Sequence, residues 1–145
     1  MFNVHNRPQI PLISPSTNTL DQSIQFSNVL IDAVVSLAHI QVLVDTGAAV
    51  TVVSTEFYHN ILSTSSPLEH SQVLQSVKTA NGAHIPIEGI ATFGLGLAHT
   101  KYKCSAYVVS GLSYPVVLGR DFLQQNRAII SMGAHTVDFL DDNVL

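Results

Sequence analysis

One stretch constrains the fold of this chain more than any other, the segment 42–54, which reads VLVDTGAAVTVVS. An apolar run brings one carboxylate, Asp45, to a turn that contains Thr46 and Gly47, and a second apolar run begins near Val50. Short apolar runs bounded by turn residues are typical of buried β-strands, so we expect one strand to end at Asp45 and another to begin near Val50. A carboxylate fixed at a strand end in an apolar shell suits acid/base chemistry. An isolated Asp-Thr-Gly more commonly only shapes a turn.

The rest of the chain predicts many short strands. Alternating or continuous apolar runs between turn residues indicate strands at 9–13, 29–37, 40–44, 50–53, 72–79, 84–97, 102–109, 115–118, 128–131 and 136–139. Neither an internal repeat nor a coiled-coil heptad pattern is present. Frequent short strands with few helices predict one all-β, barrel-like domain.

Two short helices and one hairpin interrupt this pattern. A helix is expected over 55–62, with Ser54 or the residue after it as N-cap. A second helix is expected over 122–126, capped by Asp121. Asn81 and Gly82 form the dipeptide that most strongly signals a tight hairpin, here between the strands at 72–79 and 84–97.

Composition narrows the class of protein. The chain has 145 residues, which favours one domain, and only 11% are charged, which favours a large buried or self-associating surface. The net charge is −4 and basic runs are absent, so nucleic acid is not an expected partner. No apolar run has the length of a membrane span, so no membrane association is expected. The Pro- and polar-rich residues 1–27 are expected to form an N-terminal arm, and 28–145 the domain.

Histidine and cysteine give no signal for a metal or another cofactor. The single Cys104 cannot form an internal disulfide and is expected to be a small buried apolar residue. The histidines show neither the close spacing nor the Cys cluster of a metal site; they are His5, His39, His59, His70, His84, His99 and His135. We therefore expect no metal and no cofactor.

Asp45 can be half of a catalytic pair. Two carboxylates held close together share one proton, so one acts as a base toward water while the other donates to a carbonyl oxygen. The other aspartates of the chain lack the setting of Asp45, so the second carboxylate would come from a second copy across a two-fold axis. A hairpin tipped by residues 80–83 would cover an extended peptide and exclude water. The alternative is an ordinary surface hairpin.

Three segments, in this order, carry a resemblance to a known family. They are VLVDTGAAVTVVS at 42–54, VKTANGAHIPIEG at 77–89 and PVVLGRDFLQQNRAIIS at 115–131. With them the chain resembles the retropepsins, the dimeric aspartic proteases of retroviruses and long-terminal-repeat retrotransposons. The second and third segments look closest to the Ty3/gypsy-type enzymes and their domesticated cellular relatives. The resemblance implies a closed barrel with a flap hairpin that forms a two-fold homodimer.

The resemblance also implies roles for individual residues. Asp45 would be the catalytic carboxylate, Thr46 would lock the two loops across the axis, and Gly47 would offer its carbonyl to the substrate. Substrate contacts are implied for Leu43, Ala48, Ala49, Val52, Ala80, Asn81, Gly82, Ala83 and Val117. The segments 9–13 and 136–139 of both subunits would interleave into a sheet at the base of the dimer.

The helix entry would support the catalytic loop, and there the chain departs from the family. Gly119 would pack under the loop, braced by Arg120 and Asp121. Many viral members have an aspartate where this chain has Ala49, and that aspartate pairs with the arginine of the helix entry. Arg120 therefore needs another partner, either a carbonyl or an acid from the second subunit.

The sequence leaves three hypotheses. The first is a homodimeric aspartic endopeptidase that cuts an extended polypeptide between apolar residues, in a retroelement the polyprotein that contains it, in the cytoplasm or inside particles. The second is a retropepsin-fold module for dimerisation or peptide binding with little or no turnover. The third is an unrelated β-barrel that happens to contain Asp-Thr-Gly.

Overall fold

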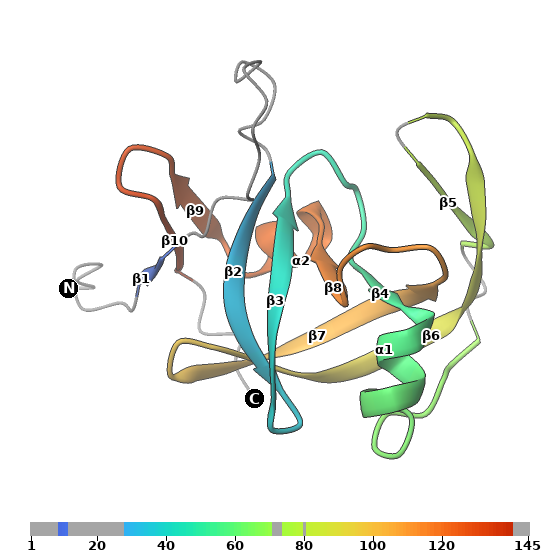
Figure 1. Ribbon diagram of the computed structural model, residues 1–145. Helices are drawn as coiled ribbons and strands as arrows, with labels where there is room; N and C mark the ends of the chain where they lie inside the picture. Colours follow the sequence, from blue (N-terminus) through green and yellow to red (C-terminus); the bar gives the residue numbers. More distant parts are fainter. Residues whose placement is uncertain (1–8, 12–27, 71–73, 80, 141–145) are drawn as a thin grey trace.

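The computed structural model describes residues 9–11, 28–70, 74–79 and 81–140 (Figure 1). Its elements in chain order are β1 (Gln9–Pro11), β2 (Asn28–Val35), β3 (Ala38–Asp45), β4 (Val52–Ser54), α1 (Thr55–Phe57), the π-helical turn η2 (Tyr58–Leu62), β5 (Ser76–Lys78), β6 (His84–Leu97), β7 (Thr100–Val109), β8 (Val116–Leu118), α2 (Arg120–Gln125), β9 (Ala128–Ser131) and β10 (Thr136–Phe139). No helix in these ranges has the length and apolar character needed to cross a membrane.

The larger sheet closes into a barrel. Its strands follow the order β2-β3-β8-β4-β7-β6, and β6 pairs back with β2 where Gly96 lies opposite Val34. β5 adds to the outer edge of β6, and these two strands form a hairpin that projects from the barrel (Figure 1). The prediction of an all-β, closed barrel with short helices is confirmed.

Every second side chain of the long strands points into the barrel and fills it. Every second residue of β6 from Ala91 to Leu97 is buried, and β7 buries Tyr102, Cys104 and Ala106 in the same way. This period of two follows from strand geometry, which turns successive side chains to opposite faces. Each large apolar side chain that is fully buried contributes about 1.5–3 kcal/mol, so the barrel is a rigid base for whatever it carries.

A smaller sheet stands beside β2, at the left of Figure 1, in the order β1-β10-β9. Ile10 and Val137 lie opposite each other in it and both join the barrel core. The short strand β1 therefore belongs to the fold, although it falls within the expected N-terminal arm. β10 has a neighbour on each side, whereas β9 pairs only with β10 among the described strands.

Local predictions differ from the structure in form and length. The expected helix over 55–62 is present with these bounds, but after one α-helical turn it continues as the π-helical η2, in which Tyr58 and Leu62 are both buried. Its N-cap is confirmed, because the Ser54 hydroxyl accepts a hydrogen bond of 3.0 Å from the backbone N–H of Phe57. The expected strand over 72–79 is β5 from Ser76 to Lys78; positions 71–73 lie outside the described residues.

Candidate active site

A tight turn presents Asp45 at the end of a buried strand. The preceding β3 residues Val42 and Val44 are fully buried and pair in parallel with β8. The backbone N–H of Gly47 donates a 2.9 Å hydrogen bond to Asp45 Oδ1, and that of Ala48 donates to the Asp45 carbonyl at 3.1 Å. A Cβ on Gly47 would lie 3.2 Å from the same carboxylate oxygen, so glycine gives the carboxylate its room. The carboxylate is thus held in place while its residue stays half-buried.

The start of α2 packs directly against this loop. The backbone N–H groups of Arg120 and Asp121 donate to the carbonyls of Ala48 and Ala49, at 2.8 and 3.2 Å. A Cβ on Gly119 would lie only 2.4 Å from the Val50 carbonyl oxygen, closer than real Cβ contacts. Only glycine allows the two backbones to approach this closely. The loop and the helix therefore form one unit.

A side-chain lock joins the same two segments. Thr51 is fully buried; its hydroxyl donates to Asp121 Oδ1 at 2.6 Å, and its backbone N–H donates to Oδ2 at 3.1 Å. The Thr51 hydroxyl in turn accepts from the Gly119 N–H at 3.0 Å. The prediction that Asp121 caps the helix was wrong: Gly119 is the N-cap, and Asp121 lies in the first turn and holds Thr51. Sequence reasoning did not single out Thr51, although a lone hydroxyl inside an apolar run is the signal that marks it.

Arg120 reaches the loop without an acidic partner. Its Nη1 donates to the Thr46 carbonyl at 3.2 Å, so among the described residues it bonds a carbonyl, which is one of the two expected alternatives. Ala49 and Thr46 are both exposed. The guanidinium therefore supports the turn that follows Asp45.

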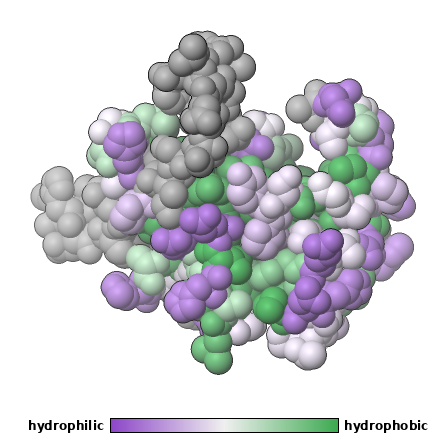
Figure 2. All heavy atoms as spheres, in the orientation of Figure 1, coloured by the Kyte–Doolittle hydropathy of each residue, from purple (hydrophilic) through white to green (hydrophobic). Residues whose placement is uncertain are grey.

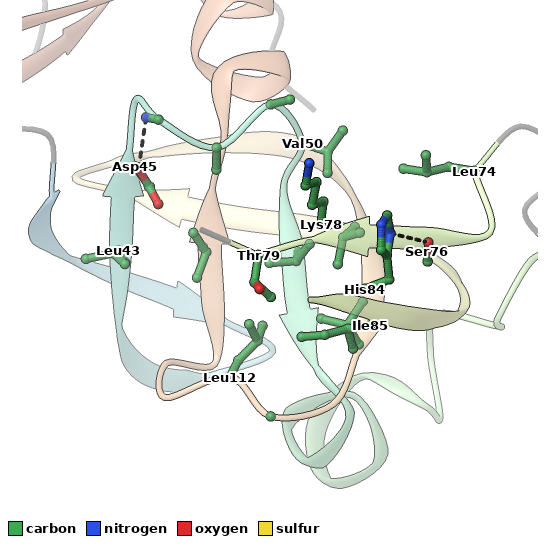
Figure 3. Close-up of a pocket in the computed structure, with 18 of the residues that line it drawn as sticks. Leu43, Asp45, Val50, Leu74, Ser76, Lys78, Thr79, His84, Ile85 and Leu112 are labelled. Atoms are coloured by element: carbon green, nitrogen blue, oxygen red, sulfur yellow. Dashed lines mark hydrogen bonds between the residues drawn. The ribbon is translucent and has the colours of Figure 1, made fainter. Parts of the chain in front are cut away.

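A cavity of about 1000 Å³ lies between this loop and the β5–β6 hairpin (Figure 3). Asp45 contributes the only carboxylate among its described lining residues. The cavity is mostly apolar, because Val52, Val109 and Val117 form a buried cluster against which further apolar residues pack, namely Leu43, Val50, Val77, Ile85, Ile87, Tyr107, Leu112 and Tyr114. Figure 2 shows the hairpin standing away from the body of the molecule, with hydrophobic residues at its base.

Most, but not all, of the residues expected at the site line this cavity. Those that do are Leu43, Asp45, Gly47, Ala48, Ala49, Val52 and Val117. Asn81, Gly82 and Ala83 do not line it; they form the exposed hairpin tip, where Gly82 has a positive φ of 89°. Ala80 lies outside the described residues.

Sequence reasoning missed two groups of lining residues. Leu112 and Tyr114 come from the loop before β8, and Lys78 and His84 come from the hairpin strands. The alternation of Leu112 and Tyr114 just before an expected strand is a weak signal for the first group. The second group depends on how the hairpin folds over the barrel, which no local pattern records. In the described part of the chain, no three His, Cys, Asp or Glu side chains gather as a metal site.

Comparison with known proteins agrees with this geometry. A family model described as "gag-polyprotein putative aspartyl protease" matches residues 31–125. Three solved structures are similar to the chain at 18% identity: the retroviral protease-like domain of Ddi1 from Leishmania major, EIAV protease with the inhibitor HBY-793, and a retropepsin-like aspartic protease from Rickettsia conorii.

The alignments with these structures are extensive. Their TM-scores are 0.56, 0.58 and 0.60, and they cover 80%, 81% and 91% of this chain and 96%, 100% and 91% of the other. The barrel therefore has the retropepsin fold.

Proposed function

We propose that this chain, which belongs to the gag-polyprotein aspartyl protease family, is an aspartic endopeptidase that acts as a homodimer. One observation carries the proposal: the loop after β3 presents a single fixed carboxylate, Asp45, to an apolar cavity in which no other described lining residue is acidic. Two carboxylates held close together can activate water without a metal. A second copy of the chain supplies the other one.

The mechanism follows from the shared proton. Across the two-fold axis, one Asp45 carboxylate takes a proton from water while the other, protonated, donates to the carbonyl oxygen of the scissile peptide. The water oxygen attacks the carbonyl carbon to give a diol. The diol collapses when the carboxyl that took the proton from water passes it to the leaving nitrogen and the other carboxylate takes a proton from a diol hydroxyl. Thr46, on the exposed side of the loop, would contact the opposing loop, and Gly47 would hold the substrate backbone.

The small sheet offers an edge for the second copy. The strand β10 is paired on both sides within the chain, so it is not available for interleaving. Of the two outer strands, β1 is short and ends in Pro11, which lacks an N–H. β9 has an unpaired edge among the described strands and exposes Ile129 by 51%, and the next residue along the chain, Met132, by 37%. An unpaired edge with exposed apolar side chains favours pairing with another chain.

The position of β9 fits this role. The helix α2 begins at the loop of Asp45 and, after Asn126 and Arg127, leads into β9. A six-residue helix spans about 9 Å, so the edge lies close to the loop that must meet its partner. In Figure 1 the loop after β3 and the strand β9 both lie in the upper part of the molecule.

The substrate is an extended polypeptide with apolar side chains at the cut. Leu43, Val52 and Val117 line the cavity and favour apolar side chains next to Asp45. An extended peptide can pair with the β5–β6 hairpin as an added strand. In a retroelement, this substrate is the polyprotein that contains the enzyme.

Cleavage of a mixed peptide library in mildly acidic solution tests the proposal. The parent chain is expected to cut, and Asp45→Asn is expected to lose at least about a thousandfold in rate, because the variant keeps the shape of the side chain but not its acid/base role. Equal cutting by both proteins contradicts the proposal.

Two lysine substitutions test the dimer edge. Ile129→Lys places a charge in the proposed contact and is expected to give a monomer without activity. Leu37→Lys is the matched control, because Leu37 is 91% exposed in the turn between β2 and β3, away from β9. Mass in solution by light scattering, together with turnover, gives the result. A dimer that survives Ile129→Lys places the interface elsewhere.

A peptide-binding module with little turnover is the second candidate. It is favoured by Ala49, which leaves Arg120 bonded to a carbonyl instead of an acid at the loop. The library experiment separates the two candidates: a stable dimer that binds peptides but cuts none would be such a module.

A further inference from the structure

Two basic side chains face each other across the hairpin that borders the cavity. Lys78 on β5 lies directly opposite His84 on β6 in the antiparallel register, and both line the cavity. The Ser76 hydroxyl lies 3.3 Å from His84 Nδ1, which leaves Nε2 as the nitrogen available to a ligand. In Figure 3 the Lys78 side chain extends from its strand toward Val50.

Among the described residues, no acidic side chain forms a salt bridge with Lys78. The loop residues that line the cavity beside Val50 are Ala48 and Ala49, and neither carries a charge. His59 Nε2 lies 3.9 Å from Glu88 Oε1, and neither residue lines the cavity. Lys78 therefore brings to the cavity a positive charge that no described residue pairs with.

The positive charge of Lys78 is opposite in sign to the net charge of the chain. Acidic residues outnumber Lys and Arg by 10 to 6, so an anionic substrate would be repelled from most of the surface. The other described cations lie elsewhere: Lys101 and Lys103 are exposed on β7, Arg120 bonds the Thr46 carbonyl, and Arg127 precedes β9. Among the cavity's described lining residues, Lys78 is the only Lys or Arg.

We propose that Lys78, with His84 beside it, selects peptide substrates that carry an acidic side chain outside the two apolar residues at the cut. The inference rests on the proposed function, because it treats the cavity as the peptide site. The lining next to Asp45 is apolar, as Leu43 and Val117 show, and Figure 3 places Asp45 at one side of the cavity and His84 at the other. A carboxylate that reaches the hairpin side would gain a charge-assisted hydrogen bond from Lys78.

The specificity would come from attraction and from rejection together. An apolar wall with one cation favours a Glu or Asp side chain and opposes a Lys or Arg side chain at the same position. Because Lys78 is exposed to solvent, the discrimination between Glu and Gln is expected to be about 1.4-fold to fivefold, the range of an exposed charge pair.

The test uses blocked peptides with a central Leu-Leu pair and one Glu, Gln or Lys placed in turn at each other position. Each peptide is made with a normal central bond, for turnover, and with a reduced central bond, for binding by fluorescence anisotropy. The proteins are the parent dimer, Lys78→Gln, Lys78→Glu and the control Lys103→Gln, which removes an exposed lysine that does not line the cavity.

The expected result is specific to one position of the peptide. The parent and Lys103→Gln bind the Glu peptide about 1.4-fold to fivefold more tightly than the Gln peptide, less so at high salt. Lys78→Gln loses this preference, and Lys78→Glu prefers the Lys peptide. Equal binding of Glu and Gln peptides at every position, or a preference that survives in Lys78→Gln, overturns the inference. Binding without turnover of the normal peptides contradicts the protease proposal alone, so the two failures are distinct.

Discussion

The floor and the roof of the cavity are built in opposite ways. The floor consists of the loop after β3 and the start of α2, which are joined by backbone and side-chain hydrogen bonds between residues about seventy positions apart in the sequence. The roof is the β5–β6 hairpin, whose described tip residues Asn81, Gly82 and Ala83 are exposed and bond within the tip. Segments with many buried contacts open rarely, whereas exposed hairpins open at low free-energy cost. The floor fixes the carboxylate, and in the proposed protease the roof would move to admit a peptide.

The floor depends on specific contacts at a few positions. Thr51 is fully buried and bonds both carboxylate oxygens of Asp121, and Gly119 allows the closest backbone approach in the site. In the roof, the tightest feature is the tip, where the Asn81 side chain accepts from the Ala83 N–H at 3.1 Å. Substitutions in the floor should therefore change stability, and substitutions in the roof should change substrate binding.

The largest effect is expected for Gly119→Ala. The new Cβ would lie 2.4 Å from the Val50 carbonyl oxygen, so the loop must move, and the free energy of unfolding should fall by about 3 kcal/mol. Gly133→Ala is the control, because its Cβ would meet nothing within 4 Å; it should change stability by less than about 0.5 kcal/mol. Urea unfolding measures both. Similar values for the two variants would mean that the floor is not rigid.

Thr51→Val should have the next largest effect. It keeps the shape but removes the hydroxyl, so the Gly119 N–H loses its acceptor and Asp121 Oδ1 keeps only its hydrogen bond from the Phe122 N–H, at a cost of about 2 kcal/mol. Thr51→Ser, which retains the hydroxyl, should recover most of this loss. If Val and Ser variants unfold at the same denaturant concentration, the lock contributes nothing to the floor.

A smaller stability effect is expected at the roof. Asn81→Ala removes the side-chain bonds of the hairpin tip, but because the tip is exposed the free energy of unfolding should change by less than about 0.5 kcal/mol. The KM for a peptide should rise, since the covering hairpin is less well ordered. A large loss of stability with an unchanged KM would reverse the proposed roles of floor and roof.

The reactivity of the Cys104 thiol is a second way to compare the opening of the floor with that of the roof. Burial raises the pKa of this thiol, which lies in the core on β7, with the charge of Asp121 as a smaller cause. The raised pKa keeps the thiol protonated and unreactive in the folded chain. Because the thiol of the unfolded chain loses its proton at a lower pH, the free energy of unfolding keeps its full value at neutral pH and falls as the solution becomes strongly alkaline. Labelling by a thiol reagent should be faster in Gly119→Ala and unchanged in Asn81→Ala. Faster labelling in Asn81→Ala would show that roof and core open together.

Some elements followed from the sequence because their causes are local. The apolar alternation of residues 84–97 predicted β6 with its observed bounds, and 128–131 and 136–139 predicted β9 and β10 in the same way. The turn at Asp45 and the N-cap at Ser54 also depend only on neighbouring residues. Where the form of an element depends on distant packing, that form was not predicted: the helix over 55–62 continues as the π-helical η2, and β5 is shorter than expected.

The candidate site shows the same division. The resemblance of three short segments, in order, to the retropepsins was enough to indicate an aspartic protease and its carboxylate, because each motif is written in adjacent residues. The lock between Thr51 and Asp121, the unpaired edge of β9, and the place of Lys78 at the cavity were decided only by the tertiary structure. Each depends on which distant segments come to lie together, and that is set by how the barrel closes and not by any residue's neighbours in the chain.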